Sequence, residues 1–67
     1  MRNRIAELRK AQHLTQQDLA DRVGVTRQTI ISLENGRYNP SITLAFKLSR
    51  TFGQTIEEIF VLEEDES

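Results

Sequence analysis

Residues 15–36, TQQDLADRVGVTRQTIISLENG, decide how this chain folds. Thr15 can cap a helix because its hydroxyl can accept the backbone N–H of Asp18, and an acidic residue in the first turn suits the helix dipole. Apolar residues follow at helical spacing, and Gly24 can end the helix because it adopts the left-handed conformation without a Cβ clash. The stretch therefore predicts a short helix that ends in a tight corner.

A second helix is predicted after the corner, over about 27–34, with Thr26 as its cap and Gly36 as its stop. Its apolar stripe, Ile30 and Leu33, predicts a face that packs on a core. The other stripe is polar and consists of Gln28, Ser32 and Asn35, with Arg27 and the apolar Ile31 beside it. Such groups suit base edges, since glutamine pairs with adenine and arginine with guanine. Two helices joined in this way predict a helix-turn-helix whose second helix enters the major groove of DNA.

The match to a known family rests on residues that occur in order at fixed spacing: Gln16, Leu19, Ala20, Val23, Gly24, Val25, Thr26, Ile30, Leu33, Glu34, Asn35 and Gly36. These residues resemble the helix-turn-helix of the Xre/Cro/phage-repressor family. The likeness continues through 37–41, RYNPS, a run typical of the short bacterial regulators in that family. It covers about residues 3–60, with the helix-turn-helix at about 16–35. The resemblance implies an all-α, five-helix, lambda-repressor-like DNA-binding domain.

With 67 residues, the chain is long enough for one domain, which we expect to span residues 1–67. No cysteine is present, so neither a disulfide nor a thiolate metal site can stabilise the fold, and we expect no metal or other cofactor. The longest apolar run is far shorter than the roughly 20 residues that span a bilayer, and no signal-peptide pattern opens the chain. These features predict a cytoplasmic protein with no membrane partner, associated with the nucleoid when it is bound to DNA.

Charge is segregated along the chain, so the formal net charge of −1 hides a basic part. Residues 1–50 carry all nine Lys and Arg against four acidic residues, a balance of +5, whereas residues 51–67 carry six acidic residues and no base, a balance of −6. The local field of the basic part is what attracts nucleic acid. We expect the acidic C-terminal end, about 61–67, to lie away from DNA, because it would repel phosphate.

Three further helices complete the predicted fold. The spacing of apolar residues predicts a helix over about 3–12 and another over about 42–52, with Ser41 as the cap of the latter. A short fifth helix is expected from the Thr55 cap to about Phe60. The apolar run FVL at the end of that helix is either a short strand or part of a dimer seam.

The residues that we expect to contact DNA lie on or beside the second helix of the motif: Gln16, Arg27, Gln28, Thr29, Ser32, Asn35, Arg37 and Tyr38. Arg27 and Gln28 open that helix, where side chains reach deepest into the major groove. The resemblance implies that Gln16 donates to a phosphate and braces the recognition helix. It also implies that the segment after this helix grips the phosphate backbone, a contact that carries little sequence information.

Several of these residues have a plainer alternative. Gln16 can be a solvated polar residue in a first turn, and Arg27 and Gln28 can be an exposed pair of good helix formers. Thr29 can bond back to the preceding turn, and Asn35 can cap its own helix end. Tyr38 can pack its ring on the domain.

Two titratable residues are expected to have structural roles only. Glu34 stands at the end of the recognition helix near basic residues, which predicts an ion pair with Arg9 or another base. His13 is the only histidine, and the chain has no cysteine, so neither a metal site nor a catalytic role has the partners it needs. We therefore expect His13 to be a loop residue.

These observations favour a sequence-specific DNA-binding transcriptional regulator, with a repressor as the simplest form. One helix reads too few base pairs for a genome, so we expect a homodimer on a palindromic operator. The candidate dimer interface is the last helix and the residues after it: Thr55, Glu57, Ile59, Phe60, Val61 and Leu62. The alternative is an antitoxin or adaptor-type module of the same fold, which binds a protein partner. No nucleophile–base set, metal cluster or phosphate loop points to an enzyme.

Overall fold

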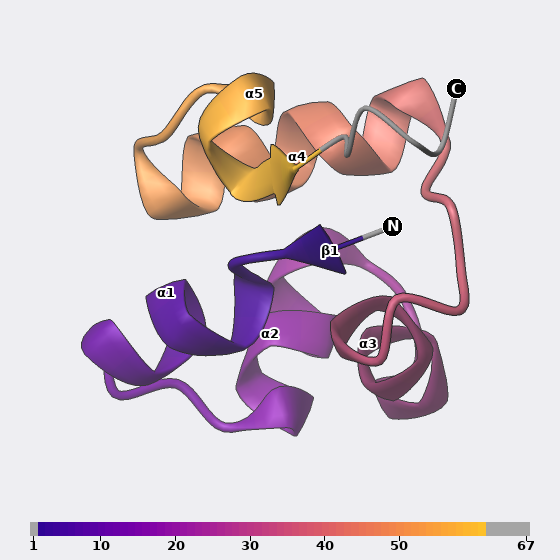
Figure 1. Cartoon of the computed structure of the whole chain (residues 1–67). Helices are drawn as coiled ribbons and strands as arrows, with labels where there is room; N and C mark the ends of the chain where they lie inside the picture. Colours follow the sequence, from indigo (N-terminus) through magenta and orange to yellow (C-terminus); the bar gives the residue numbers. More distant parts are fainter. Residues whose placement is uncertain (1, 62–67) are drawn as a thin grey trace.

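The computed structural model describes residues 2–61, which form five helices around one core and a small sheet near the chain ends (Figure 1). The elements in order are β1 Arg2–Asn3, α1 Ile5–Ala11, α2 Gln16–Val23, α3 Arg27–Glu34, α4 Ile42–Phe52, α5 Ile56–Ile59 and β2 Phe60–Val61. In Figure 1, α4 and α5 form the upper layer, and α1, α2 and α3 lie beneath them. The prediction of an all-α, five-helix fold with a short C-terminal strand is confirmed.

The three central helices have the predicted bounds, but the first and last do not. The first helix was predicted over 3–12, whereas Asn3 lies in β1 and α1 begins only after Arg4, which makes no side-chain capping hydrogen bond. The last helix ends at Ile59 because Phe60 has an extended backbone (φ −105°, ψ 129°) and belongs to β2. Both differences have one cause, which is that the two ends of the domain pair with each other.

Side-chain caps decide where α2 and α3 begin. The hydroxyl of Thr15 accepts the backbone N–H of Asp18 at 3.0 Å, and the Asp18 carboxylate accepts the backbone N–H of Thr15 at 2.9 Å. Thr26 caps α3, since its hydroxyl accepts the backbone N–H of Thr29 at 3.2 Å. Between the two helices, Gly24 has a φ of +73°, a left-handed conformation that other residues rarely adopt. The predicted corner between α2 and α3 is therefore present, and it is formed by the expected cap and the left-handed glycine.

Every helix contributes apolar side chains to the core, and none of the fully buried residues within 2–61 is polar or charged. The buried residues are Ile5, Leu19, Ala20, Val23, Ile30, Leu33, Leu44, Ala45, Leu48, Phe52 and Ile59. Burying a side chain of the Leu, Ile or Phe type contributes roughly 1.5–3 kcal/mol, so these residues supply most of the driving force for folding. The packing of Ile30 and Leu33 also fixes which face of α3 remains outside.

A two-stranded antiparallel sheet joins the two ends of the domain, with Arg2 opposite Val61 and Asn3 opposite Phe60. The backbone N–H of Arg4 extends the contact by donating to the carbonyl oxygen of Ile59 at 2.8 Å. A strand of two residues has too short a pattern to show alternation. For that reason β1 was not predicted.

The turn after α1 contains a non-glycine residue in the left-handed conformation. His13 has a φ of +58°, and its backbone N–H donates to the carbonyl of Lys10 at 3.0 Å. The next residue, Leu14, donates to the carbonyl of Arg9 at 3.1 Å. This pair of hydrogen bonds closes a helix end of the kind that usually has glycine at the left-handed position. His13 is a loop residue, as predicted.

Candidate nucleic-acid interface

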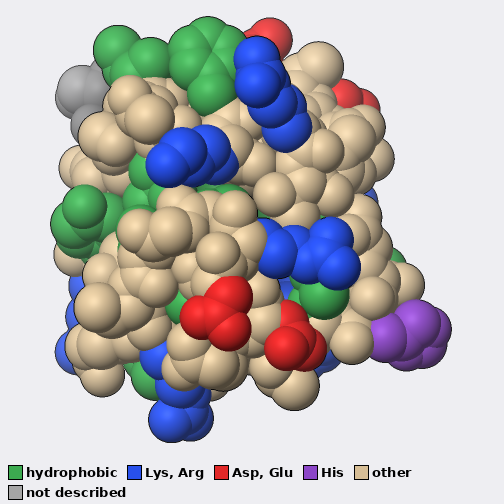
Figure 2. Space-filling view, turned by 180° about the vertical axis from the view of Figure 1, so that it is seen from behind, with side chains coloured by type: hydrophobic (Ala, Val, Ile, Leu, Met, Phe, Trp, Pro, Cys, Tyr) green, Lys and Arg blue, Asp and Glu red, His purple; other side chains and the backbone are tan. Residues whose placement is uncertain are grey.

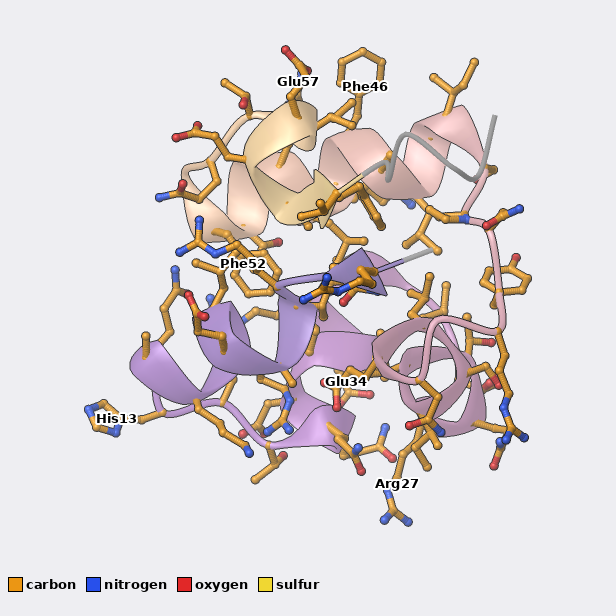
Figure 3. All side chains as sticks on the ribbon, in the orientation of Figure 1. His13, Arg27, Glu34, Phe46, Phe52 and Glu57 are labelled. Atoms are coloured by element: carbon orange, nitrogen blue, oxygen red, sulfur yellow. The ribbon has the colours of Figure 1, made fainter. Side chains whose placement is uncertain are left out.

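The recognition helix α3 has one face in the core and one face in solvent. Ile30 and Leu33 are fully buried, whereas Arg27, Gln28 and Asn35 are exposed. The side chain of Arg27 extends away from the body of the domain (Figure 3). Residues on the outer face thus have the placement that the helical spacing predicted.

Two further residues on the outer side of α3 are half-buried, Thr29 and Ser32. The hydroxyl of Thr29 lies 3.0 Å from the hydroxyl of Thr26, within the cap of the same helix. This contact favours the local role for Thr29, because its hydroxyl already has a partner in the first turn. Ser32 lies one helical turn after Gln28, so the two side chains share a stripe.

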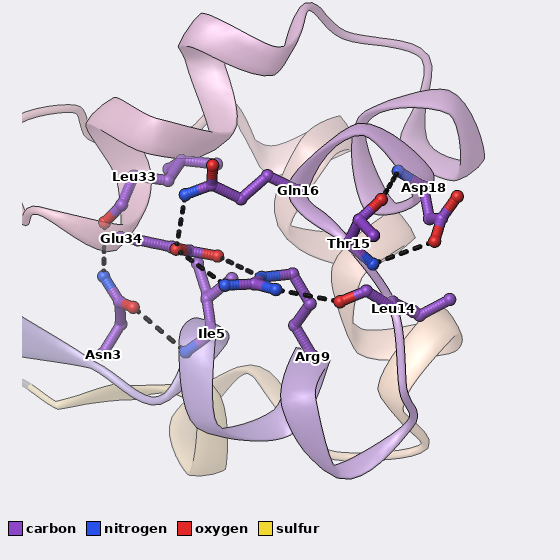
Figure 4. Close-up of polar contacts among 9 residues, drawn as sticks. All are labelled: Asn3, Ile5, Arg9, Leu14, Thr15, Gln16, Asp18, Leu33 and Glu34. Carbon is purple, nitrogen blue, oxygen red and sulfur yellow. Dashed lines mark hydrogen bonds and ion pairs between the residues drawn. The ribbon is translucent and has the colours of Figure 1, made fainter.

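A polar network joins the three helices α1, α2 and α3 (Figure 4). Arg9 Nε lies 2.7 Å from Glu34 Oε2, and the two side chains are only 11% and 9% exposed. Arg9 Nη1 also donates to the carbonyl of Leu14 at 2.8 Å. The amide of Gln16 donates to Glu34 Oε1 at 3.2 Å. The predicted ion pair between Glu34 and Arg9 is confirmed, and the structure adds Gln16 to it.

This network fixes Gln16 at the start of α2. One N–H of its amide is directed to Glu34, and a side-chain amide has a second N–H that a phosphate oxygen can accept. Gln16 is half-buried. A side chain held in this way loses less conformational freedom on binding than a free one.

The segment after α3 carries the remaining predicted DNA contacts. Gly36 has a φ of +73°, and the backbone N–H of Arg37 donates to the carbonyl of Ser32 at 3.0 Å, so the chain leaves the helix in a defined direction. Asn35, Arg37 and Tyr38 are all exposed, and Tyr38 retains 44% of its surface. The exposure of Tyr38 does not favour the alternative in which its ring packs on the domain.

The structure also reveals a residue beside this segment that the sequence did not single out. The side-chain amide of Asn3 donates to the carbonyl oxygen of Leu33 at 2.7 Å (Figure 4). No local pattern indicates such a contact, because the two residues are 30 positions apart. Only the pairing of β1 with β2 places Asn3 beside the end of α3.

Four acidic residues can be placed relative to α3 or to a helix cap. Glu34 is paired with Arg9, and Glu57 lies at the opposite end of the domain from Arg27 (Figure 3). The backbone N–H and then the hydroxyl of Thr15 lower the pKa of Asp18, and those of Thr55 lower the pKa of Glu58 in the same way. Both carboxylates are therefore ionised caps of their helices.

An apolar surface covers the end of the domain formed by α4, α5 and β2. Hydrophobic side chains gather there at the upper edge of the molecule, with Lys or Arg side chains next to them (Figure 2). Ile42 is 77% exposed, Phe46 55% and Val61 41%. Ile42 and Phe46 lie on a groove of about 310 Å³, which is lined by Asn39, Pro40, Ser41, Ile42, Ala45, Phe46, Ile56 and Phe60.

Some of the residues expected at a dimer interface are exposed, and others are partly or fully buried. Thr55 and Glu57 are exposed, Phe60 is half-buried and Val61 is exposed. Ile59 is fully buried in the core, so its side chain is not available to a second subunit. Leu62 and the acidic end lie outside the described residues. Ile42 and Phe46 were not expected at this surface. The spacing of residues along α4 does not show how much of this helix the neighbouring elements cover.

Two features are absent from residues 2–61. No helix in this part of the chain is long and apolar enough to cross a membrane. Over the same residues, no cluster of His, Cys, Asp and Glu side chains is arranged to hold a metal ion.

Known proteins are similar to this chain in sequence and in fold. A family model described as helix-turn-helix matches residues 5–59. An HTH-type transcriptional regulator of Methanocaldococcus jannaschii is 52% identical over 66 residues, which cover 98% of this chain and 100% of the relative. YgzD of Bacillus subtilis, also an HTH-type transcriptional regulator, is 43% identical over 65 residues, with 97% and 98% covered.

Solved structures agree with this assignment. The restriction-modification controller protein C.AhdI from Aeromonas hydrophila has a TM-score of 0.76 at 33% identity, with 85% of this chain and 86% of that chain covered. A chain of the SinR–SinI protein complex has a TM-score of 0.78 at 25% identity, with 96% of this chain and 63% of that chain covered. The chain belongs to the helix-turn-helix family of transcriptional regulators, which are DNA-binding proteins and not enzymes.

Proposed function

We propose that this protein is a single-domain, sequence-specific regulator that binds a palindromic operator as a homodimer and represses transcription. The observation that carries the proposal is the division of α3 into a buried apolar face and an exposed polar face. A helix held in this way can enter the major groove without disturbing the core. Repression needs no effector domain, because a bound dimer blocks access to the promoter.

The roles of the DNA-contact residues follow from their positions. Arg27 and Gln28 open α3 and read base edges, with Ser32 one turn later on the same stripe. Gln16, Asn35, Arg37 and Tyr38 surround the helix and bind phosphates, which sets the register on the duplex. Thr29 contributes through the cap of α3. In the cell, such a protein acts in the cytoplasm, on the nucleoid.

Dimerisation supplies the specificity that one recognition helix lacks. Two copies on a two-fold axis place their recognition helices in successive major grooves, about 34 Å apart. The seam that we propose is the α4–β2 surface, defined as Ile42, Phe46, Phe60 and Val61, with Thr55 and Glu57 at its rim. Ile42, Phe46 and Phe60 line one groove, and exposed apolar side chains that gather on a small domain suit an interaction site. Ile59 supports the seam from the core.

A protein partner is the second candidate for the same surface. The chain that this protein resembles in fold belongs to a complex of SinR with SinI. An antitoxin or adaptor of this fold would bind such a partner through the α4–β2 surface, and α3 would bind nothing. The exposed arginine and amides of α3 favour the DNA-binding homodimer, because a surface helix without a binding role has no reason to present these groups together.

The test is selection from a random duplex library with the full chain, followed by binding to the recovered sequence at several salt concentrations. An inverted repeat is expected, with an affinity that falls steeply as salt rises because phosphate contacts release counterions. Sedimentation of the complex should show two chains on each duplex. If no sequence is enriched, the proposal is wrong, and a search for a protein partner becomes the next experiment.

A further inference from the structure

One side chain ties the N-terminal strand to the C-terminal end of the recognition helix. Asn3 Nδ2 donates to the carbonyl oxygen of Leu33 at 2.7 Å, and Asn3 Oδ1 accepts the backbone N–H of Ile5 at 3.1 Å (Figure 4). The amide thus has a partner on each side. It connects the start of α1 to the end of α3, which the chain itself does not bring together.

The backbone of Asn3 is held by the small sheet rather than by its neighbours in sequence. Asn3 lies opposite Phe60 in the β1–β2 ladder. The following residue, Arg4, donates its backbone N–H to Ile59 at 2.8 Å and its guanidinium to the carbonyl of Glu58 at 3.4 Å. Because Ile59 is fully buried, this frame is anchored in the core.

The carbonyl that Asn3 reaches lies at the point where α3 ends. The same oxygen of Leu33 accepts the backbone N–H of Gly36 at 3.0 Å, and the adjacent carbonyl of Ser32 accepts the N–H of Arg37 at 3.0 Å. These two hydrogen bonds turn the chain out of the helix. The bond from Asn3 therefore acts on the turn that sets the direction of residues 35–38.

We propose that Asn3 is a positioning residue of the DNA interface, whose amide holds the C-terminal end of α3 and so directs residues 35–38 toward the phosphate backbone. The inference rests on the proposed function, in which this segment sets the register of α3 in the groove. Hydrogen bonds weaken steeply with distance and angle, so a small displacement of the segment is enough to lose a phosphate contact. Asn3 itself need not contact DNA.

Asn3→Ser is the informative variant. Serine is short and keeps an oxygen that can accept the N–H of Ile5, but it does not reach Leu33, and it leaves the net charge unchanged. At a temperature where both proteins are fully folded, the Kd for the selected operator should rise about five- to tenfold. A role in overall stability alone would not change the Kd of a folded protein. An unchanged Kd would overturn the proposal.

A double-mutant cycle identifies where Asn3 acts. In an Arg37→Ala background, Asn3→Ser should raise the Kd by a smaller factor. The direction of the segment has less influence on binding once the cation of Arg37 has been removed. Combined with Gln28→Ala, at the opposite end of α3, the two effects should multiply independently. Independent effects in both pairs would show that Asn3 does not act through the segment after α3.

Amide hydrogen exchange separates this inference from the proposed function, because it needs no DNA. In Asn3→Ser, the amides of Gly36 and Arg37 should exchange at least several-fold faster, while that of Leu48 in the core remains unchanged. If the wild-type protein selects no operator, the proposed function fails and exchange alone decides the role of Asn3. Unchanged exchange at Gly36 and Arg37 would then exclude a positioning role.

Discussion

The guanidinium of Arg9 on α1 and the carboxylate of Glu34 at the end of α3 lie 2.7 Å apart and are nearly enclosed by the fold. The pair connects the first helix to the recognition helix, and Gln16 joins it from α2. A buried ion pair contributes little compared with an apolar replacement, yet the removal of one partner is severe because the other charge is left unpaired. The orientation of α3 therefore depends on both residues together.

Glu34→Ala should destabilise the domain by about 3–5 kcal/mol, because it leaves the Arg9 charge without its carboxylate. Urea denaturation followed by circular dichroism measures the loss. The double variant Arg9→Met with Glu34→Leu is the control, since it leaves no unpaired charge and should lose less stability than Glu34→Ala. Equal losses in the two proteins would show that packing, rather than charge, determines the effect.

Arg27→Ala should weaken binding to the selected operator by about 1–3 kcal/mol, the value of one bidentate base contact, with little effect on stability. Fluorescence anisotropy with the operator and with a scrambled duplex measures the specificity ratio. Arg50→Ala is the matched control, because it removes the same charge from an exposed position on α4. If both variants lose affinity equally on both duplexes, Arg27 contributes only general attraction.

Phe46→Ser should weaken self-association at least tenfold, because it removes an exposed ring from the α4–β2 surface. The stability of the monomer should change by less than about 0.5 kcal/mol, since the side chain is 55% exposed. Sedimentation equilibrium gives the dimer constant. Lys47→Ser, next to it on α4, should leave association unchanged. A wild-type protein that stays monomeric on its operator would contradict the proposed seam.

His13→Gly should stabilise the domain by about 0.5–1 kcal/mol, because glycine adopts a φ of +58° without the strain of a Cβ. Gly53→Ala is the reciprocal experiment. Gly53 has a φ of +65°, and a Cβ added there would meet nothing within 4 Å. The expected decrease of about 1 kcal/mol in the free energy of unfolding would therefore come from the backbone conformation alone. Thermal unfolding of both variants checks the pair, and a destabilised His13→Gly protein would show that the imidazole has a contact of its own.

Asp18 and Glu58 should make the domain less stable in acid. The pKa of each carboxyl is lowered in the folded state, mainly by a backbone N–H of Thr15 or Thr55. The contribution is therefore complete above the pKa of the unfolded chain, near pH 4, and is lost as the pH falls through the lower folded value. The difference in unfolding free energy between wild type and Asp18→Asn should shrink from pH 6 to pH 3. A constant difference would mean that the cap does not depend on ionisation.

The helix-turn-helix could be predicted because its causes are local. Caps such as Thr15 and Thr26, the left-handed Gly24 and the spacing of Ile30 and Leu33 all act within one or two turns, where sequence order is also spatial order. The exposed stripe of α3 followed from the same spacing. The residues that read DNA were therefore accessible to prediction, although their contacts with DNA remain a proposal.

The last helix shows the limit of this reasoning. Its apolar residues are Ile56 and Ile59, and a helix of four residues is too short for its spacing to show which of them faces inward. Ile59 was expected on a dimer surface and instead lies fully buried. The surface that remains apolar includes Ile42 and Phe46 of α4, because α5 covers only part of that helix.

The sequence by itself determined the class of fold, the recognition helix and the absence of a disulfide. Only the tertiary structure decided that the chain ends pair as β1 and β2, and that Asn3 reaches Leu33. The physical reason is distance along the chain. Caps and helical faces arise from neighbours a few residues apart, whereas the sheet and the Asn3 contact join residues tens of positions apart, which meet only in the folded domain.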